Sequence, residues 1–499
     1  MKNSIKKNIY KWHRTLGLLT IIPVLFWCLS GLMHPFLSHW FKPQIAHEWI
    51  PAKPLNPSDF QYSIPQVLRK NGMEQLKKYR VVQFDGQTYY QIKNLDDRWR
   101  YFNTRTGEEL KDGDRLYAVF LARYFLQDSL SPVKSISLQT EFSQQYKYIN
   151  RLLPVWKVSF DRADEMDIYV ETPYSRLGTF NPSSRKWFLW VFDNFHNWSF
   201  LSDITNNTIR IFIMILFLTI IGLSAFSGIM IYGFMWRWFK KPDPGDKKGI
   251  LRRYHRQIGI SVALVTLTFA FSGGYHATQK LEPNYLPRMS YEPVIDQSEF
   301  PDSIALSAIN WDKLTNMSMI KKDTMLFHQF FYKSEKGAPP NIVYVNMHDG
   351  SIWQNGNMEY AIWLSQFFRD RFELKQLSGA AQKASNGVAS GSQTVPVLKT
   401  EWVPAFEKRE YGFAFKRLPV IRISYDTPEK TNDYIEPATC RLAASIDESD
   451  RYEGYSFAVF HKFLFLEWAG KDVRDMAMVL SVFGIFTISL MGLVLYLKK

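Results

Sequence analysis

Cysteine is scarce in this sequence, with two among 499 residues. Cys28 lies in an apolar stretch and Cys440 in a polar region, so we expect no internal disulfide, and a metal site built on thiolates is excluded. No G-x-G-x-x-G motif follows a predicted strand and no P-loop is present, so the chain carries no signature of a nucleotide-binding site. Closely spaced histidine motifs typical of zinc, such as H-x-x-E-H, are also missing.

Long apolar runs, in contrast, are abundant. Four stretches have the length of a membrane span: Thr15–Phe36, Ile209–Phe234, Gln257–Thr278 and Met476–Leu497. None of them contains an acidic residue, which argues against a transporter that couples to protons or metal ions. The two long segments between spans one and two and between spans three and four read as ordinary soluble sequence. The sequence therefore predicts an integral membrane protein with large domains outside the bilayer.

Basic residues set the predicted orientation of the spans. They concentrate in three places: before the first span, between the second and third spans, and at Lys498–Lys499. Positive flanks of this kind remain in the cytoplasm, so both termini are expected there and the large domains on the opposite side. These segments account for nearly all of the net charge of +14. The charge therefore reflects topology, and we expect no nucleic-acid partner.

The sequence contains a long internal repeat. "KWHRTLGLL" at Lys11 recurs as "RYHRQIGIS" at Arg253, an offset of 242 residues. "YAVFLARYF" and "YAIWLSQFF" are offset by 243 residues, and "VWKVSF" and "VIRISY" by 265. A Gly/Ser/Ala-rich insertion, Ser378–Lys399, accounts for the change of offset and is expected to be a mobile loop. The pattern predicts a tandem duplication into parallel repeats related by an axis along the membrane normal.

Each copy reads as span, soluble domain, span. Alternating apolar runs predict strands in the domains, and the "YAVFLARYF" pair predicts a helix. We therefore predict a four-helix transmembrane bundle with two α+β domains. The boundaries are 1–36 for the N-terminus and first span, 37–208 for the first domain, 209–234 for the second span, 235–256 for a basic loop, 257–278 for the third span, 279–475 for the second domain, and 476–499 for the last span and C-terminus.

Three pairs of histidines recur in the two copies. They are His13 and His255, His34 and His276, and His196 and His461. The first and second histidine of each copy are 21 residues apart, about 31 Å along a helix, which places one near each membrane face. Twenty-one residues are three heptads, so both point to the same side of the bundle. The third pair precedes spans two and four in aromatic stretches typical of the outer interface.

Facing histidines on bundle helices can hold b-type haem through neutral imidazoles on both faces of the iron. One interfacial histidine can equally be an anchor, but repeat-related pairs of polar groups at a membrane favour a function. His13 and His255 are the expected ligands on the cytoplasmic side. Four imidazoles remain on the outer side, enough for one haem or two, and their pairing stays open: His34, His276, His196 and His461.

Several other residues have structural interpretations. The repeated Ser30–Gly31 and Ser272–Gly273 either admit a flat macrocycle or allow close helix packing. Four histidines have no partner in the repeat, and we interpret them as surface or structural residues: His39, His47, His328 and His348.

A family resemblance rests on specific motifs. "KWHRTLGLL" and "RYHRQIGIS" open a span, "SGLMH" and "SGGYH" close it, and "RLLPVWKVSF" is followed by "DIYVETPYSRLG" and by a histidine before the next span. In these the chain resembles the PepSY-associated transmembrane proteins. The resemblance implies PepSY-like periplasmic domains, a bacterial inner-membrane location and b-type haem. It matches His13 and His255 to the family's cytoplasmic-end histidine, and His196 and His461 to its histidine before the second span.

Members of that family include reductases that pass cytoplasmic electrons to periplasmic ferric siderophores. We therefore expect a transmembrane cytochrome with two or three haem b groups that reduces a ferric siderophore or chelate. With no nucleotide motif, its electrons must come from quinol or from a soluble cytoplasmic reductase. The alternative is a non-redox, membrane-tethered PepSY regulator or inhibitor of extracytoplasmic peptidases, in which the histidines bind nothing.

Overall fold

The computed structural model of the chain describes residues 2–239, 241–281, 289–301, 309–333, 341–381, 395–407, 410–412 and 415–497. Residues 382–394 of the predicted Ser378–Lys399 loop, and the terminal Lys498 and Lys499, lie outside the described residues. The chain forms two compact units. We call Met1–Gln44, Ser183–Pro283 and Ser449–Lys499 the helical unit, and Ile45–Pro182 with Asn284–Glu448 the sheet unit.

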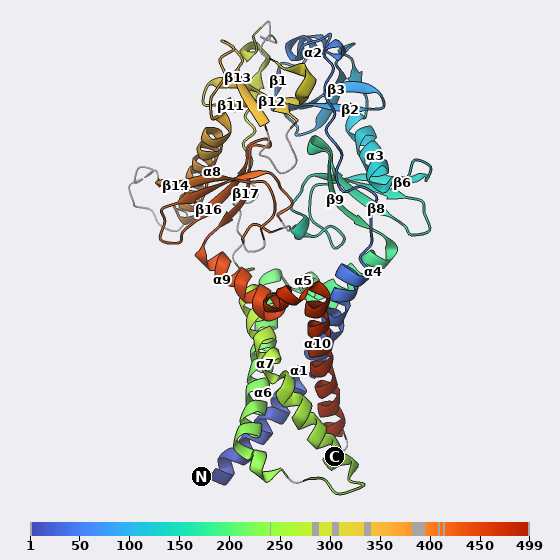
Figure 1. Cartoon of the computed structure of the whole chain (residues 1–499), viewed down its shortest axis with the longest axis vertical. Coiled ribbons are helices and arrows are strands. Elements are labelled where there is room, and N and C mark those ends of the chain that lie inside the picture. The colour runs from blue at the N-terminus through green and yellow to red at the C-terminus, as the bar shows by residue number, and fades with distance from the viewer. Residues whose placement is uncertain are drawn as a thin grey trace. The chain divides into compact units, whose positions relative to one another are not determined.

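Four long helices make up most of the helical unit (Figure 1). They are α1 (Lys2–Pro35), α6 (Asn207–Met235), α7 (Lys247–Thr278) and α10 (Lys471–Leu497). All four are long and apolar enough to cross a membrane, which confirms that the four predicted apolar stretches are helical. Both α1 and α7 pack against α6 and against α10. The helices α1 and α7 therefore occupy opposite corners of the bundle.

Side-chain caps fix where two of these helices begin. Oδ1 of Asn206 accepts a hydrogen bond of 2.9 Å from the backbone N–H of Ile209 in α6, and Oδ1 of Asp246 accepts one of 2.8 Å from Gly249 in α7. Such caps satisfy backbone donors that have no partner in a first helical turn. Because Asp246 is the cap, α7 starts well before the predicted Gln257, and the end of the predicted basic loop is helical.

Shorter helical segments precede α6 and α10 in the chain. Before α6 come α4 (Ser183–Val191), the π-helical turn η5 (Phe192–His196) and α5 (Ser199–Ile204). Before α10 come α9 (Glu448–Ser456), the π-helical turn η12 (Phe457–His461) and the 3-10 helix η13 (Leu464–Ala469). A third π-helical turn, η1 (Phe36–Trp40), extends α1. Each π-helical turn contains a histidine, and such turns are frequent at functional sites.

Within the described residues, the sheet unit is built on one seven-stranded and two four-stranded antiparallel sheets. The central sheet, in spatial order, has β13 (Asn341–Asn346), β12 (Met325–Tyr332), β11 (Leu314–Lys322), β2 (Lys78–Phe84), β3 (Gln87–Lys93), β4 (Trp99–Asn103) and β5 (Glu109–Leu110). One smaller sheet has β6 (Val133–Gln139), β7 (Val155–Phe160), β8 (Asp167–Glu171) and β9 (Arg176–Asn181). The other has β14 (Val397–Val403), β15 (Val420–Tyr425), β16 (Asn432–Glu436) and β17 (Arg441–Ile446).

Besides these sheets, the described part of the sheet unit contains a short two-stranded ladder and three α-helices. The strands β1 (Gln75–Leu76) and β10 (Ile295–Asp296) form a two-stranded ladder. The helices are α2 (Ile64–Lys70), α3 (Gly113–Leu126) and α8 (Gly356–Ala381). Gly113 and Gly356 begin α3 and α8 against an aromatic residue, since an added Cβ would lie 2.7 Å from ring atom Cγ of Tyr101 and 2.7 Å from ring atom Cδ2 of Tyr344. A larger residue would push either helix away from the central sheet.

The two predicted domains share the central sheet. Strand β2 of the first half pairs with β11 of the second, with Arg80 opposite Ser318. The Asn316 side chain continues this ladder, because its Nδ2 donates to the Val81 carbonyl at 2.7 Å and its Oδ1 accepts from the Val81 N–H at 3.2 Å. The segments predicted as separate domains, 37–208 and 279–475, therefore contribute to one compact unit. Pairing between such distant strands is a tertiary contact that no local pattern indicates.

Corresponding elements recur at the offsets present in the sequence. The strands β7, β8 and β9 begin and end 265 residues before β15, β16 and β17, and α3 begins 243 residues before α8. Side-chain contacts recur as well. Tyr146 stacks on Tyr169 with 4.8 Å between ring centres, and Tyr411 stacks on Tyr434 at 4.4 Å. The two halves of the sheet unit thus have the same local architecture.

Candidate functional site

His13 and His255 lie next to each other inside the helical unit. His13 is on α1 and His255 on α7, the helices at opposite corners of the bundle. Their ring centres are 6.3 Å apart and the ring planes are inclined by 65°. Both side chains are half-buried. We call this the inner pair, and it brings together the two residues that the repeat makes equivalent.

The helices beside the inner pair orient its rings. Nδ1 of His13 is 3.0 Å from the Ser224 carbonyl and 3.0 Å from the Ser227 hydroxyl, both on α6. A carbonyl oxygen can only accept, so the proton is on Nδ1 and the lone pair is on Nε2. The Ile488 carbonyl of α10 is the corresponding neighbour of His255, although the buried Nδ1 of His255 makes no hydrogen bond of normal geometry.

Glycines leave space beside both rings of the inner pair. A Cβ added to Gly228 of α6 would lie 3.3 Å from Cε1 of His13, and one added to Gly492 of α10 would lie 3.5 Å from Cε1 of His255. These two glycines stand 264 residues apart, close to the offset of the surrounding repeat. Each inner histidine therefore has a glycine of the flanking helix against the same ring atom.

His196 and His461 form a second, outer pair. They end the π-helical turns η5 and η12, and their ring centres are also 6.3 Å apart, with ring planes inclined by 89°. Nδ1 of His196 is 3.0 Å from the hydroxyl of Ser30 on α1, and Nδ1 of His461 is 3.3 Å from the hydroxyl of Ser272 on α7. The repeat-related serines thus contact the repeat-related histidines.

These serines set the protonation of the outer rings. Each hydroxyl donates its single proton to a carbonyl one turn earlier on its own helix, at 2.8 Å. The serine oxygens therefore accept from the imidazole Nδ1–H, which leaves the lone pair on Nε2. Burial lowers the pKa of His196 to about 3 and that of His461 to about 4. Both imidazoles are thus neutral at neutral pH, the form that binds a metal.

His34 and His276 are not brought together as a pair. Nδ1 of His34 is 3.3 Å from the hydroxyl of Ser38, one turn along the chain. Nδ1 of His276 is 2.5 Å from Oε1 of Glu453. Each ring contacts an aromatic residue of a π-helical turn, and no ring contact joins the two histidines within the described residues. They lie close enough to His196 to interact with it electrostatically.

The other four histidines have ordinary surroundings. Nδ1 of His39 is within hydrogen-bonding distance of Oδ2 of Asp475, at 2.8 Å, in the helical unit. His47 stacks on a tyrosine ring of the sheet unit, His328 is buried within β12, and His348 is exposed after β13. These positions agree with a structural or surface role.

The inner and outer pairs fit haem iron better than zinc. Among the residues that the structure describes, no group of three or more His, Cys, Asp or Glu side chains could hold a metal ion. Haem iron needs only axial ligands from the protein. If one metal ion were bound between two imidazoles, each metal–nitrogen bond would be about 2 Å long and each nitrogen lies about 1 Å from its ring centre. The two ring centres would then be about 6 Å apart. Both pairs have this separation.

The helices and these sites define a multi-pass membrane protein with two histidine pairs in its helical unit. The chain belongs to the family described as the PepSY-associated TM region, whose model matches residues 10–499. The match covers nearly the whole chain and confirms the resemblance seen in its motifs. Among curated proteins, no significant match was found.

Sequence reasoning missed most of the residues that position the histidines. Ser224, Gly228 and Gly492 lie in apolar helices with no motif around them, and Glu453 lies in a polar stretch. The repeat indicated Ser30 and Ser272 only as small residues, although their equivalence at an offset of 242 residues was a usable signal. Side-chain partners depend on how the helices pack, and this packing cannot be predicted from a local sequence pattern.

Proposed function

We propose that this protein is a transmembrane b-type cytochrome that passes electrons to a ferric chelate. The observation that carries the proposal is the recurrence of one geometry, a His–His ring separation of 6.3 Å, at both histidine pairs. His13 and His255 would hold one haem, and His196 and His461 a second. Haem b supplies a one-electron carrier when bound. His34 and His276 remain outside both pairs, so we propose two haems.

The positions of the two pairs support electron transfer across a membrane. Ser30, which contacts His196, follows His13 by 17 residues on the same helix, about 26 Å along its axis. The hydrocarbon core of a bilayer is about 30 Å thick. One pair therefore lies near each end of the span. If both histidines of a pair bound one haem, the pair would favour electron transfer over binding of a further ligand at the metal.

The proposed topology follows from the duplicated order of elements and from the basic segments. We propose that the repeat arose by tandem duplication, that both termini and the loop between α6 and α7 are cytoplasmic, and that the sheet unit is periplasmic. The sheet unit is supplied by the segments between α1 and α6 and between α7 and α10. Both segments lie on one side if all four helices span the bilayer. This corresponds to a bacterial inner-membrane location.

The proposed acceptor is a ferric siderophore or another ferric chelate. Such a chelate is too polar to enter the bilayer, so its reduction requires electrons delivered to the outer face. Reduction also releases the metal, because hard oxygen ligands hold Fe²⁺ less firmly than Fe³⁺. Quinol or a soluble cytoplasmic reductase would supply the electrons.

A liposome assay tests this function. Protein reconstituted with the sheet unit outward and reduced from within should be reoxidised by an externally added ferric chelate, and Fe²⁺ should appear outside at a matching rate. A gallium chelate of the same ligand, which cannot be reduced under these conditions, is the control. Reoxidation by oxygen or quinone with ferric chelates inert would contradict the proposed acceptor.

Gly228→Val is expected to remove the inner haem and leave the outer one. The new side chain would occupy the space beside Cε1 of His13, where a Cβ alone already lies at 3.3 Å. Displacing the ring breaks the axial geometry, so haem content should fall by about half. Gly233→Val on the same helix is the matched control, because no atom lies within 4 Å of a Cβ at that position. Equal haem content in the two variants, measured per chain, would show that His13 is not a ligand.

A further inference from the structure

A stripe of polar side chains crosses the middle of the central sheet. Arg80 on β2 is opposite Ser318 on β11 and Gln91 on β3, and Ser318 is in turn opposite Gln329 on β12. Directly opposed residues of antiparallel strands share a face of the sheet. Arg80 is 9% exposed, and the other three side chains are fully buried. The stripe therefore places a charge and several polar groups inside the sheet unit.

Arg80 is a buried cation without a hydrogen-bonding partner. Its Nε and Nη1 atoms are buried and make no hydrogen bond. No carboxylate of the described residues forms an ion pair with it. The guanidinium instead lies against two rings, 4.5 Å from the centre of Tyr174 and 5.2 Å from that of Phe331. Ring contacts compensate only part of the cost of burying a charge.

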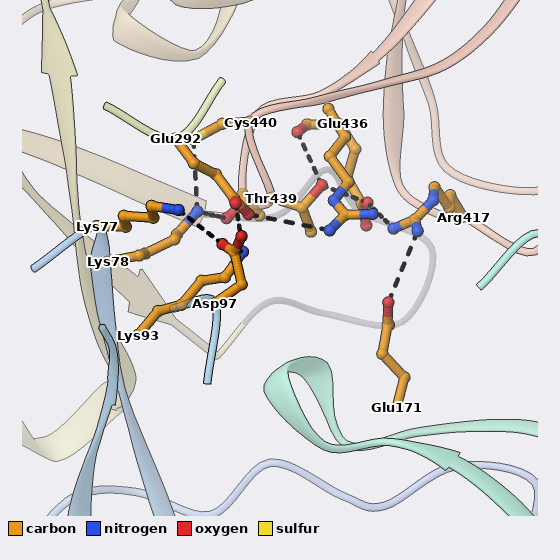
Figure 2. A network of polar contacts seen from close by, with 12 residues as sticks. Lys77, Lys78, Lys93, Asp97, Glu171, Glu292, Arg417, Glu436, Thr439 and Cys440 are labelled. Atoms are coloured by element: carbon orange, nitrogen blue, oxygen red, sulfur yellow. Dashed lines mark hydrogen bonds and ion pairs between the residues drawn. The ribbon is translucent and has the colours of Figure 1, made fainter. Parts of the chain in front are cut away.

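A second unpaired cation lies beside it. Lys78 is two residues before Arg80, on the same face of β2, and is 3% exposed. Its Nζ donates to the Ala438 carbonyl at 3.1 Å and to Sγ of Cys440 at 3.4 Å. Figure 2 shows Lys78 beside Cys440. No ion pair joins it to a carboxylate of the described chain. Arg80 and Lys78 are thus two neighbouring buried cations without an ion-pair partner among the described residues.

The neighbouring charges, in contrast, are paired. Glu436 accepts from Arg176 and, at 3.0 Å, from Arg417, and Glu292 pairs with Lys93 (Figure 2). The network in this part of the sheet unit therefore has acidic partners for these basic groups. Glu436 and Glu292 also attract Arg80 and Lys78 electrostatically, but no ion pair joins them to either cation among the described residues.

The stripe also contains acceptors without donors. Oε1 of Gln91 and Oε1 of Gln329 are buried and make no hydrogen bond. The hydrogen bonds that the two amide nitrogens donate fix the orientation of both side-chain amides. Nε2 of Gln91 donates at 2.6 Å to the hydroxyl of Tyr101, whose own proton goes to Asp114 at 2.9 Å. The unpartnered atom of Gln91 is therefore an oxygen, one strand away from Arg80.

We propose that Arg80 and Gln91 belong to a binding site for a compact oxyanion that carries a hydroxyl group, such as a hydroxycarboxylate or hydrogen phosphate. Arg80, assisted by Lys78, binds the anionic oxygens, because a guanidinium offers several donors to an oxyanion. Gln91 accepts from the ligand hydroxyl. Such a ligand would pair with the buried cations and satisfy the unpartnered polar atoms together, whereas water supplies no negative charge. This site is separate from the histidine pairs and does not depend on the proposed redox function.

Binding to the full-length protein in detergent tests the site. Glycolate, phosphate and acetate are titrated by calorimetry at constant ionic strength, with chloride as background. We expect saturable binding of glycolate or phosphate at one ligand per chain, and whichever binds more tightly identifies the source of the oxyanion. Acetate has no hydroxyl group and should bind at least several-fold more weakly than glycolate. In Gln91→Leu this preference for glycolate should disappear.

Two arginine variants decide the role of the charge. Arg80→Gln should weaken binding of the favoured anion more than about tenfold, whereas Arg98→Gln, in the exposed turn after β3, should bind as the wild type does. If Arg80→Gln does not fold, Arg80→Lys keeps the charge but lacks the planar fork and should also bind more weakly. A wild-type protein that binds none of the probes, or an Arg80 variant that binds them with unchanged affinity, would overturn the proposal.

Discussion

Replacing either His13 or His255 by alanine is expected to remove about half of the bound haem. In the proposed function both residues would contribute to one haem site, since their rings lie 6.3 Å apart on helices at opposite corners of the bundle. Without one of its two proposed ligands the inner haem would be held less firmly, so each variant should lose that same haem. Haem per chain, measured as the pyridine complex, and reduced-minus-oxidised spectra of the two variants should agree with each other.

The double variant distinguishes this pairing from its alternatives. If His13 and His255 hold one haem, the double alanine variant loses no more haem than either single variant, because their effects on a shared site are not additive. His348→Ala provides the control, since this histidine is exposed in the sheet unit. Additive losses in the double variant would mean that the two histidines bind separate haems, and the symmetric pairing would be wrong.

Replacing His196 or His461 by alanine is expected to stop electron delivery while sparing the inner haem. Each variant should retain about half of the haem, and this haem should still be reducible from the side of the proposed electron donor. Reoxidation by an external ferric chelate should fall more than about tenfold, because electrons would then have to leave from a site about 26 Å further along the span. The liposome assay measures both quantities on the same sample.

His34→Ala and His276→Ala are the matched controls for the outer pair. Both residues lie near His196 in the helical unit, yet their Nδ1 atoms contact Ser38 and Glu453 and their rings do not meet. We expect both variants to keep the full haem content. If one of them lost the outer haem and His461→Ala kept it, the outer ligands would have to be reassigned.

Sequence patterns predicted the elements of this protein better than their contacts. Apolar length is a local property, so the four long helices could be predicted. The exact 21-residue spacing within α1 and α7 and the repeat identified all six histidines of interest. The repeat also made His13 and His255 equivalent, and the structure places them side by side. The sequence left the outer pairing open because His196 and His461 lie in turns, whose direction depends on the packing around Ser30 and Ser272.

Contacts between strands that are distant in the chain could not be predicted from the sequence. The strands β2 and β11 each show an ordinary pattern, and nothing local indicates that Arg80 and Ser318 face each other across the middle of one sheet. The prediction of two separate domains missed this pairing for that reason. The unpartnered state of Arg80 is likewise a property of its surroundings, since an arginine in a strand pairs with a carboxylate or reaches solvent in most settings.

The absorbance spectrum of the purified full-length protein tests the central claim most directly. Protein from haem-replete cells is measured before and after addition of dithionite, and haem per chain is determined on the same preparation. Two bis-histidine sites predict a low-spin b-type spectrum whose bands sharpen on reduction, with about two haems per chain. A folded, colourless protein would contradict the cytochrome assignment and favour a non-redox role for this membrane protein.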